Sequence, residues 1–255
     1  MMLFNPFRRP APRSARTHLS AADWPDVVYA IGDVHGCLDE LRSLERNIAA
    51  DAAGIAGEKW IVMLGDYVDR GNHSAGVLDH LSAAPPPGFR RICLAGNHET
   101  MMLRFLETPG PNDDWLKFGG METLSSYGIS MSAVTRAGRK ELKAIIDSHI
   151  PQEHVAFLRD LPLTLSLPGV VFVHAGLRPG IDSVERQSED DLLWIRDEFF
   201  NAPPIQDRMV VHGHTPAAEA VCLPGRICVD TGAFATGRLT AARLRAEEPV
   251  RLLTN

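Results

Sequence analysis

The sequence predicts a layered α/β fold, and two observations support that prediction. A short apolar segment, a glycine and a helical segment follow one another three times between residues 27 and 107. Strand-like apolar segments return in the last third of the chain. Alternating strands and helices are typical of layered α/β proteins, in which active groups gather at the carboxyl ends of the strands. The polar residues that follow each predicted strand are therefore candidates for a functional site.

Each of the three repeated units contains an apolar or β-branched strand that stops at a glycine, followed by a helix. In the first helix, leucines and an isoleucine recur at steps of three and four residues, which is the pattern of one face of an amphipathic helix. The predicted strands are 27–31, 60–64 and 91–95, and the predicted helices are 38 to about 50, 74–83 and 99–107.

The segment 109–160 has a different pattern, because glycines and a proline interrupt its helical stretches. Helices are predicted over 138–148 and 152–160, and Trp115 is expected to contribute packing. We interpret the segment as a helical insertion over the rim of the site. The strands predicted after it are 170–173, 209–211, 227–229 and 238–244.

The composition is that of an ordinary globular protein. The chain has 255 residues, of which 45% are apolar and 23% are charged, and this length can bury one large core. We expect a single domain over 26–255 after a flexible basic leader over 1–25, which has the pattern of neither a signal peptide nor a membrane anchor. The net charge of −6 gives no reason to expect nucleic acid or membrane partners. The four cysteines are expected to be reduced core residues of a cytoplasmic protein.

Five short runs place metal-binding residue types at the ends of the predicted strands. Taken singly, a Gly-Asp pair usually forms a turn and a histidine is usually a satisfied polar residue. The five runs together supply enough ligands for a pair of metal ions about 3.5–4 Å apart, which needs a bridging carboxylate. Their aspartate, histidine and amide groups suit Mn²⁺, Fe or Zn²⁺. The runs are Gly32-Asp33-Val34-His35-Gly36, Gly65-Asp66-Tyr67-Val68-Asp69-Arg70-Gly71, Gly96-Asn97-His98-Glu99, His174-Ala175-Gly176 and His212-Gly213-His214-Thr215.

The order and spacing of these runs resemble a known family. Gly-Asp-x-His-Gly, Gly-Asp-x-Val-Asp-Arg-Gly and Gly-Asn-His-Glu, with about thirty residues between each, are similar to the motifs of calcineurin-like metallophosphoesterases. Within that superfamily they resemble the bacterial type of the phosphoprotein (serine/threonine protein) phosphatases. The resemblance implies a metallophosphatase-type layered sandwich of two mixed β-sheets flanked by helices, with the site at the strand carboxyl ends.

The resemblance also implies a set of metal ligands for two divalent ions, with manganese expected first and iron or zinc as alternatives. The implied ligands are Asp33, His35, Asp66, Asn97, His174 and His214. Asp33 and His35 would hold one ion and Asp66 would bridge both. The family's last ligand lies in a Gly-His-Thr-like context, which points to His214, while His212 stays open as a supporting or structural residue.

The mechanism that the resemblance implies is direct attack on phosphorus by a hydroxide that bridges the metals, without a phosphorylated enzyme. His98 would protonate the leaving alkoxide, and the negative charge of Asp69 would favour its imidazolium form. Arg70 and Arg196 would bind the phosphoryl oxygens. Many relatives that cleave diesters have a further histidine at the position of Pro216, so this residue favours monoesters.

The expected function is a phosphatase that acts on phosphoserine or phosphothreonine in proteins or peptides, with phosphotyrosine as an alternative, and also on small phosphoesters. A second hypothesis is a dinucleoside polyphosphate hydrolase of the diadenosine tetraphosphate type. In those relatives the third motif more often ends in Asp, whereas here it ends in Glu99. A third hypothesis, a non-catalytic metal-binding scaffold, is disfavoured because the predicted ligands and the acid are all present.

Overall fold

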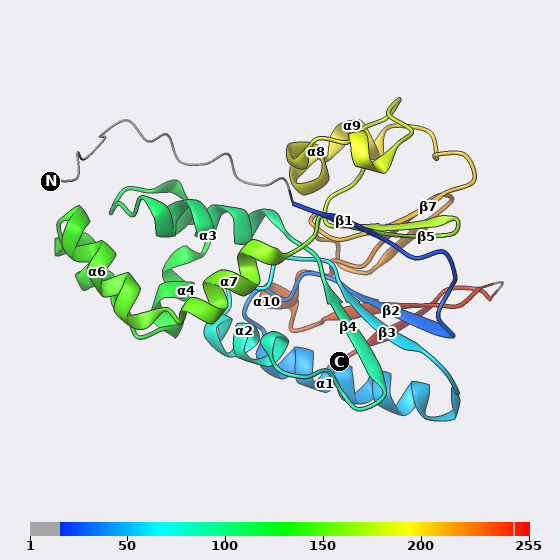
Figure 1. Ribbon diagram of the computed structural model, residues 1–255, viewed down its shortest axis with the longest axis horizontal. Helices are drawn as coiled ribbons and strands as arrows, with labels where there is room; N and C mark the ends of the chain where they lie inside the picture. The colour runs from blue at the N-terminus through cyan, green and yellow to red at the C-terminus, as the bar shows by residue number, and fades with distance from the viewer. Residues whose placement is uncertain (1–15, 247) are drawn as a thin grey trace, which may run out of the picture.

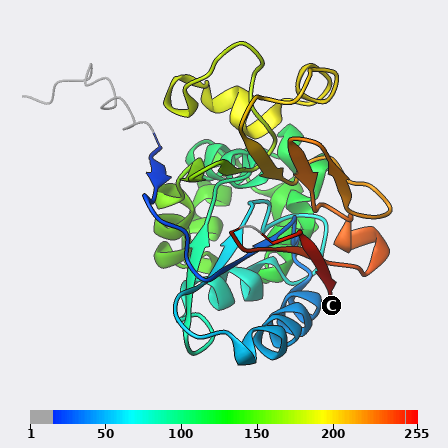
Figure 2. The same ribbon diagram turned by 90° about the vertical axis from the view of Figure 1, so that its right-hand side faces the viewer.

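The computed structural model describes residues 16–246 and 248–255 and contains two β-sheets that lie face to face between helices (Figure 1). Helices α1 (Leu38–Asp51) and α2 (Ser74–Ser82) lie outside one sheet, and α8 (Glu189–Trp194) and α9 (Asp197–Phe200) lie outside the other. The turned view in Figure 2 shows the same order of layers. Both sheets are mixed, which confirms the predicted sandwich.

The first sheet contains the strands of the three repeated units. Strands β2 (Val27–Ile31), β3 (Lys59–Met63) and β4 (Phe89–Cys93) are parallel neighbours in it. Two strands from the end of the chain, β10 (Thr240–Leu244) and β11 (Arg251–Thr254), extend it in antiparallel fashion beyond β2. Since β2, β3 and β4 are parallel, their carboxyl ends open at the same edge.

The second sheet has the strand order β1-β5-β6-β7-β9-β8. Its central strands β6, β7 and β9 are parallel, so their carboxyl ends also share one edge. The strands of this sheet are β1 (His18–Ser20), β5 (Thr164–Leu167), β6 (Val170–Val173), β7 (Met209–His212), β8 (Val221–Leu223) and β9 (Arg226–Cys228).

Apolar side chains alternate between two hydrophobic clusters along β2, whose residues are all fully buried. Val28 and Ala30 belong to the cluster that also contains Phe172 and Val211 of the second sheet. The intervening residues belong to the cluster that contains the apolar faces of the flanking helices. A strand that is buried on both faces has an uninterrupted apolar sequence, which is why 27–31 could be predicted with its bounds.

The helices predicted over 138–148 and 152–160 are present within the segment 109–160, which also contains the 3₁₀ helix η2 (Asp114–Phe118). The remaining α-helices are α3 (Asn97–Glu107), α4 (Gly120–Ser126), α5 (Met131–Arg136), α6 (Arg139–His149), α7 (Gln152–Asp160) and α10 (Ala233–Thr236). Among the described residues, no helix combines the length and the apolar character needed to cross a membrane.

Two predictions need correction. The prediction of a flexible leader over 1–25 is wrong for residues 16–25, because β1 pairs with β5 and Leu19 packs against the core between the sheets. Trp24 donates a hydrogen bond to the Pro168 carbonyl at 2.9 Å; residues 1–15 lie outside the described residues. The cysteines are not all in the core either, since Cys222 is exposed on β8.

Candidate metal centre

Five loops bring the predicted ligands together at the carboxyl edge of the two sheets. Asp33 and Asp66 follow β2 and β3, and Asn97 is the first residue of α3 after β4. His174 directly follows β6, and His214 lies two residues beyond β7. All five side chains are buried. The structure thus assembles residues that are up to 181 positions apart in the sequence.

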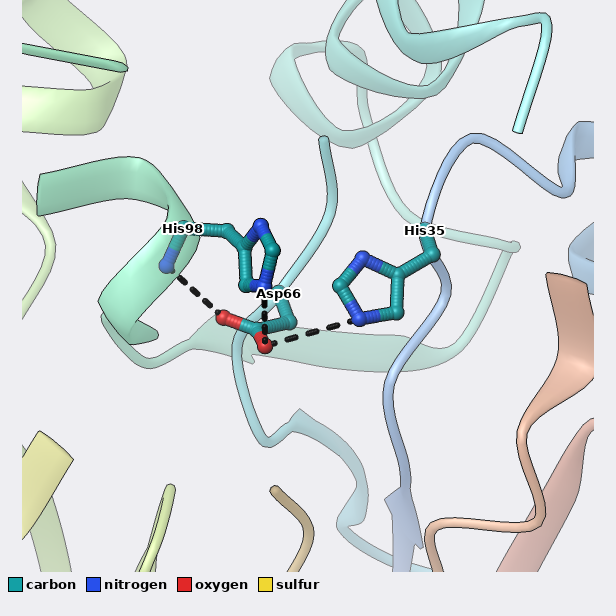
Figure 3. A group of neighbouring side chains, drawn as sticks. All are labelled: His35, Asp66 and His98. Atoms are coloured by element: carbon teal, nitrogen blue, oxygen red, sulfur yellow. Dashed lines mark hydrogen bonds and ion pairs between the residues drawn. The ribbon is translucent and has the colours of Figure 1, made fainter. Parts of the chain in front are cut away.

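Asp66 lies at the centre of the site, between imidazoles from different loops (Figure 3). Its Oδ2 atom lies 3.6 Å from Nε2 of His35 and 3.8 Å from Nε2 of His98. Its Oδ1 atom lies 3.4 Å from Nε2 of His174. Asp66 belongs both to a potential metal-binding group with His35 and His98 and to one with His174 and His214. A carboxylate shared by two ligand groups is what a two-metal site requires.

Hydrogen bonds fix the ring orientation of two of these histidines. Nδ1 of His35 lies 2.8 Å from the Val68 carbonyl, and Nδ1 of His174 lies 2.9 Å from the Leu64 carbonyl. Each Nδ1–H therefore donates to the backbone and leaves the Nε2 lone pair facing Asp66, as in many metal-binding histidines. Burial is the main cause that lowers the pKa of both imidazoles well below the usual value, so they stay neutral, the form that binds metals.

Asp33 and Asn97 contact the histidines of the second sheet. The Asp33 carboxylate accepts a hydrogen bond from the backbone N–H of His214, with distances of 3.1 and 3.2 Å to its two oxygens. Oδ1 of Asn97 lies 2.8 Å from Nε2 of His174. The rings of His174 and His214 are 4.9 Å apart. Oxygen and nitrogen donors from both sheets therefore face the same place.

Three buried carboxylates lie close together at this edge of the sheets. They belong to Asp33, Asp66 and Asp230. Burial, followed by the charges of Asp230 and Asp66, raises the pKa of Asp33 well above its usual value. Burial likewise raises the pKa of Asp66 to about 7. Buried negative charges need a compensating cation, so the residues fit bound metal ions. Sequence reasoning missed Asp230, although it follows the predicted strand 227–229 and obeys the strand-end rule.

His98 forms a buried pair with Asp69, at 2.6 Å between Nδ1 and Oδ2. Trp115 Nε1 donates to the same carboxylate at 2.7 Å, and the Thr123 hydroxyl donates to it at 2.7 Å. Burial alone would lower the pKa of His98, but the charge of Asp66 and the bond to Asp69 outweigh it and raise the pKa. The packing role predicted for Trp115 was incomplete, and no motif marked Thr123 as a site residue.

Two guanidinium groups lie beside the imidazoles. Arg70 Nη1 donates to Nε2 of His35 at 2.9 Å, and its Nη2 lies 3.2 Å from Nε2 of His98. Arg196 Nε donates to Nε2 of His214 at 3.1 Å, and its Nη2 donates to the His214 carbonyl at 3.2 Å. Both predicted phosphate-binding arginines therefore reach the site.

His212 does not face Asp66. Its ring lies 5.2 Å from the ring of Phe199 and 5.6 Å from that of Phe200, and it belongs to neither metal-binding group. Burial lowers its pKa to about 4. The geometry thus favours His214 over His212 as the ligand from the last motif.

Glu99 supports the loop that carries Asp66. Its fully buried carboxylate accepts hydrogen bonds from the backbone N–H groups of Asp66 at 2.9 Å, Tyr67 at 2.7 Å and Gly96 at 2.8 Å. The residue that ends the third motif therefore shapes two site loops.

Unusual backbone conformations are concentrated at the site. Six non-glycine residues in the described part of the chain have positive φ angles, a region in which a side chain is unfavourable. Five of them are predicted site residues, and such strain is typical of functional positions. They are His35 (44°), Asp66 (53°), Asp69 (75°), Arg70 (68°) and His214 (67°).

A layered sandwich with carboxylates, imidazoles and guanidinium groups at its strand ends defines the class of metal-dependent phosphoester hydrolases. A family model described as calcineurin-like phosphoesterase matches residues 27–241. The chain belongs to this family.

Relatives of the chain carry two kinds of name. Serine/threonine-protein phosphatase 2 of Salmonella typhimurium is 26% identical over 227 residues, which cover 86% of this chain and 93% of the relative. The asymmetrical bis(5'-nucleosyl)-tetraphosphatase PrpE of Oceanobacillus iheyensis is 27% identical over 237 residues, which cover 86% of this chain and 88% of that relative. The crystal structure of a protein proposed to be a diadenosine tetraphosphatase has a similar fold, with a TM-score of 0.66 and 22% sequence identity. The match covers 94% of this chain and 98% of that protein.

Proposed function

We propose that the chain is a metal-dependent phosphomonoesterase that acts on phosphoserine and phosphothreonine in proteins or peptides. The observation that supports this most is the position of Asp66, whose two carboxylate oxygens lie 3.6 Å from His35 and 3.4 Å from His174, next to the His98–Asp69 pair. The site thus combines the residues expected for activating a nucleophile and for protonating a leaving group.

We infer that two divalent ions are held by the six ligands that the motifs indicate. Asp66 would contribute to both ions, Asp33 and His35 to the first, and the others to the second. Hard oxygen donors with neutral imidazoles favour Mn²⁺, with Fe or Zn²⁺ as alternatives. When bound, the ions supply Lewis acidity and lower the pKa of water, so that it can attack phosphorus. The ligands proposed for the second ion are Asp66, Asn97, His174 and His214.

His98 is assigned to proton transfer rather than to metal binding. Its pKa is raised, whereas the pKa values of His35 and His174 are lowered, so His98 alone of the three favours the protonated form. Its Nδ1–H donates to Asp69, and Nε2 is therefore the atom that gives a proton to the leaving oxygen. Asp69 orients the ring and stabilises its positive charge.

Arg70 and Arg196 are assigned to the phosphoryl oxygens. A guanidinium group can donate two parallel hydrogen bonds to a phosphate and stabilise the charge that develops in the transition state. The contacts of Arg70 with His98 and of Arg196 with His214 place one guanidinium group beside each ligand group.

A cavity of about 700 Å³ between α3, α7 and α8 favours a protein substrate over a dinucleoside polyphosphate. Trp194 lines the cavity, and its ring lies 6.2 Å from that of His214, so the cavity adjoins the site. A cavity that binds a tetraphosphate chain should have an excess of positively charged lining residues. This cavity instead has at least as many carboxylates as guanidinium groups in its lining. The charged lining residues are Arg16, Arg104, Glu107, Arg159, Asp160, Glu189 and Asp190.

We further propose that the protein works in the cytoplasm. Its four cysteines are free thiols, as expected in a reducing compartment. The net charge of −6 supports neither nucleic acid nor anionic membranes as partners.

The proposal is tested by comparing p-nitrophenyl phosphate, a phosphoserine peptide and diadenosine tetraphosphate, each with Mn²⁺ and with chelator. We expect metal-dependent turnover of the first two, with kcat/KM for the peptide above that for the dinucleotide. A higher kcat/KM for diadenosine tetraphosphate would favour the hydrolase that the second group of relatives names. Absence of turnover on all three would favour the scaffold.

A further inference from the structure

A second cavity, of about 540 Å³, is lined by Arg70 and lies between η2, α4, α5 and α10. We call it the Phe118 pocket and define it by the residues Arg70, Phe118, Met121, Met131 and Phe234. Apart from Arg70, none of these residues has an assigned role in the metal centre.

The walls of the Phe118 pocket expose large apolar side chains. Phe118 is 54% exposed, Met131 is 63% exposed and Phe234 is 41% exposed. These are three of the seven large apolar side chains that are exposed in the described part of the chain. Exposed apolar side chains that gather around one cavity are typical of a binding site.

The Phe118 pocket is continuous with the metal centre through Arg70. The guanidinium carbon of Arg70 lies 4.7 Å from the centre of the Phe234 ring, within the range of a cation–π contact. Two nitrogens of the same guanidinium contact His35 and His98. The Phe234 ring also meets the His35 ring at 5.5 Å. A molecule bound at Arg70 is therefore in reach of the pocket.

The chain between η2 and α4 anchors one wall of the Phe118 pocket to the site. The backbone N–H of Arg70 donates to the Gly119 carbonyl at 3.3 Å. A Cβ atom at Gly119 would lie 2.3 Å from the Arg70 nitrogen, so no side chain fits there. The bonds from Trp115 and Thr123 to Asp69 hold the same segment on either side. The pocket wall is therefore fixed relative to Arg70.

We propose that the Phe118 pocket binds an apolar side chain that flanks the phosphorylated residue of a protein substrate. The proposal rests on the proposed phosphatase function and names a specificity site for it. Neighbouring residues of an extended peptide are about 3.3–3.6 Å apart along the chain, so a side chain one or two positions from the phosphoserine can enter a pocket that shares Arg70 with the site.

An apolar side chain fits this lining better than a nucleobase does. A buried base edge needs hydrogen-bond partners, and unpaired polar groups are costly. Apart from Arg70, the charged side chains that line the pocket are Lys117 and Glu122, and Lys117 is paired with Asp114 at 2.8 Å. Phenylalanine and methionine walls suit a phenylalanine or leucine side chain.

The test measures kcat/KM for two sets of phosphoserine peptides that differ only in phenylalanine or alanine, placed one or two positions before or after the phosphoserine. We expect the wild-type enzyme to prefer phenylalanine at one of these positions by about tenfold or more, the size of effect that an apolar pocket produces. Phe118→Ala and Met131→Ala should each reduce this preference, and Met131→Leu should retain it. Leu252→Ala, an exposed apolar change on β11, is the matched control and should keep the full preference.

The outcomes separate this proposal from the function on which it rests. Equal turnover of phenylalanine and alanine peptides by the wild-type enzyme would overturn the pocket proposal and leave the phosphatase assignment in place. Turnover of p-nitrophenyl phosphate without turnover of any peptide would overturn both. If Phe118→Ala and Met131→Ala lower kcat/KM for diadenosine tetraphosphate and leave the peptide preference intact, the pocket binds a nucleobase and the proposal is wrong.

Discussion

Among individual residues, Asp69 connects the motif residue His98 to Trp115 and Thr123, which lie in a segment without a motif. Its buried carboxylate accepts hydrogen bonds from His98, Trp115 and Thr123. A buried carboxylate is stable only when such donors or a positive charge compensate it, and His98 can provide the charge. Asp69 therefore keeps a proton on His98, and the neighbouring segment keeps Asp69 in place.

Replacement of His98 tests the assignment of the acid. We expect His98→Ala to retain its metal content and to lose about 10²- to 10⁴-fold in kcat, the usual contribution of a general acid. Metal analysis and p-nitrophenyl phosphate kinetics at neutral pH measure the two effects. Asp66→Ala is the contrasting variant, because it removes the shared ligand and should lose both metal and activity. Full activity of His98→Ala would show that another group protonates the leaving oxygen.

The pH dependence of stability can be predicted at Glu45, which lies away from the metal centre. Its buried carboxylate contacts Nε2 of His80 at 2.7 Å and Nη2 of Arg91 at 2.8 Å. Burial would raise the pKa of Glu45, but these two partners outweigh burial and lower it below the usual 4.5. A folded-state pKa below the unfolded value stabilises the protein above pH 4.5, and this stabilisation is lost as the pH falls further.

Glu45→Gln should therefore lower the free energy of unfolding at pH 7 by about 1–3 kcal/mol, because it weakens two hydrogen bonds, one of them to the buried guanidinium group of Arg91. The difference from wild type should shrink as the pH falls below 4.5. Urea unfolding at several pH values measures both effects, with the exposed Glu153→Gln as control. A difference that stays constant with pH would contradict the assigned charge of Glu45.

The residues of the site were predictable to different degrees. Ligands such as Asp33 and His35 lie in short motifs directly after strands, so the local sequence identifies them. Trp115 and Thr123 reach Asp69 from a segment without a motif, and only the tertiary packing brings them there. Asp230 follows a strand that was predicted, but its run lacks the histidine that marked the other loops.

Among the secondary-structure elements, burial decides which strands the sequence reveals. The strands 27–31 and 170–173 are buried throughout and have the predicted bounds. The strand predicted at 91–95 is Phe89–Cys93 in the structure. The sequence did not reveal its start, because two of its first three residues are charged and are half-exposed or exposed. The short edge strand β8 has only exposed residues, so no apolar pattern marks it.

The junction of η2 and α4 should be sensitive to a single methyl group. Gly119 has a φ of 108° and lies against the Arg70 backbone, so Gly119→Ala must displace one of the two. Because a shift of about 1 Å at a site can cost about 10²-fold in rate, we expect a large loss of kcat/KM for p-nitrophenyl phosphate, together with a lower melting temperature. Gly110→Ala, at a position with no other atom within 4 Å, is the control in the same segment. Wild-type activity of Gly119→Ala would show that Arg70 does not depend on this contact.

At the scale of the whole molecule, the site lies where the carboxyl ends of strands from the two sheets come together. Asp33, Asp66 and Asn97 follow strands of the first sheet, whereas His174 and His214 follow strands of the second. The strand-end rule predicts that such residues are functional, but it does not say which sheet each strand joins. That order depends on packing between segments far apart in the chain, so the sequence pattern could not provide it.

Because the ligands come from both sheets, bound metal ions should connect the sheets and stabilise the fold. A ligand that binds only the folded state adds about 2.7 kcal/mol at a free concentration of 100 times its Kd. We therefore expect the melting temperature of the wild-type protein to rise with Mn²⁺ and to fall in chelator, where the buried carboxylates of Asp33 and Asp66 lose their compensating charge.

Asp66→Ala separates this link between the sheets from a general effect of salt or chelator. The variant lacks the carboxylate that both ligand groups share, so Mn²⁺ and chelator should change its melting temperature much less than that of the wild type. It also removes one buried negative charge, and in chelator it should melt at or above the wild-type temperature because repulsion with Asp33 is relieved. Equal responses of the two proteins to Mn²⁺ would mean that the metal acts elsewhere on the chain and that the two sheets hold together without it.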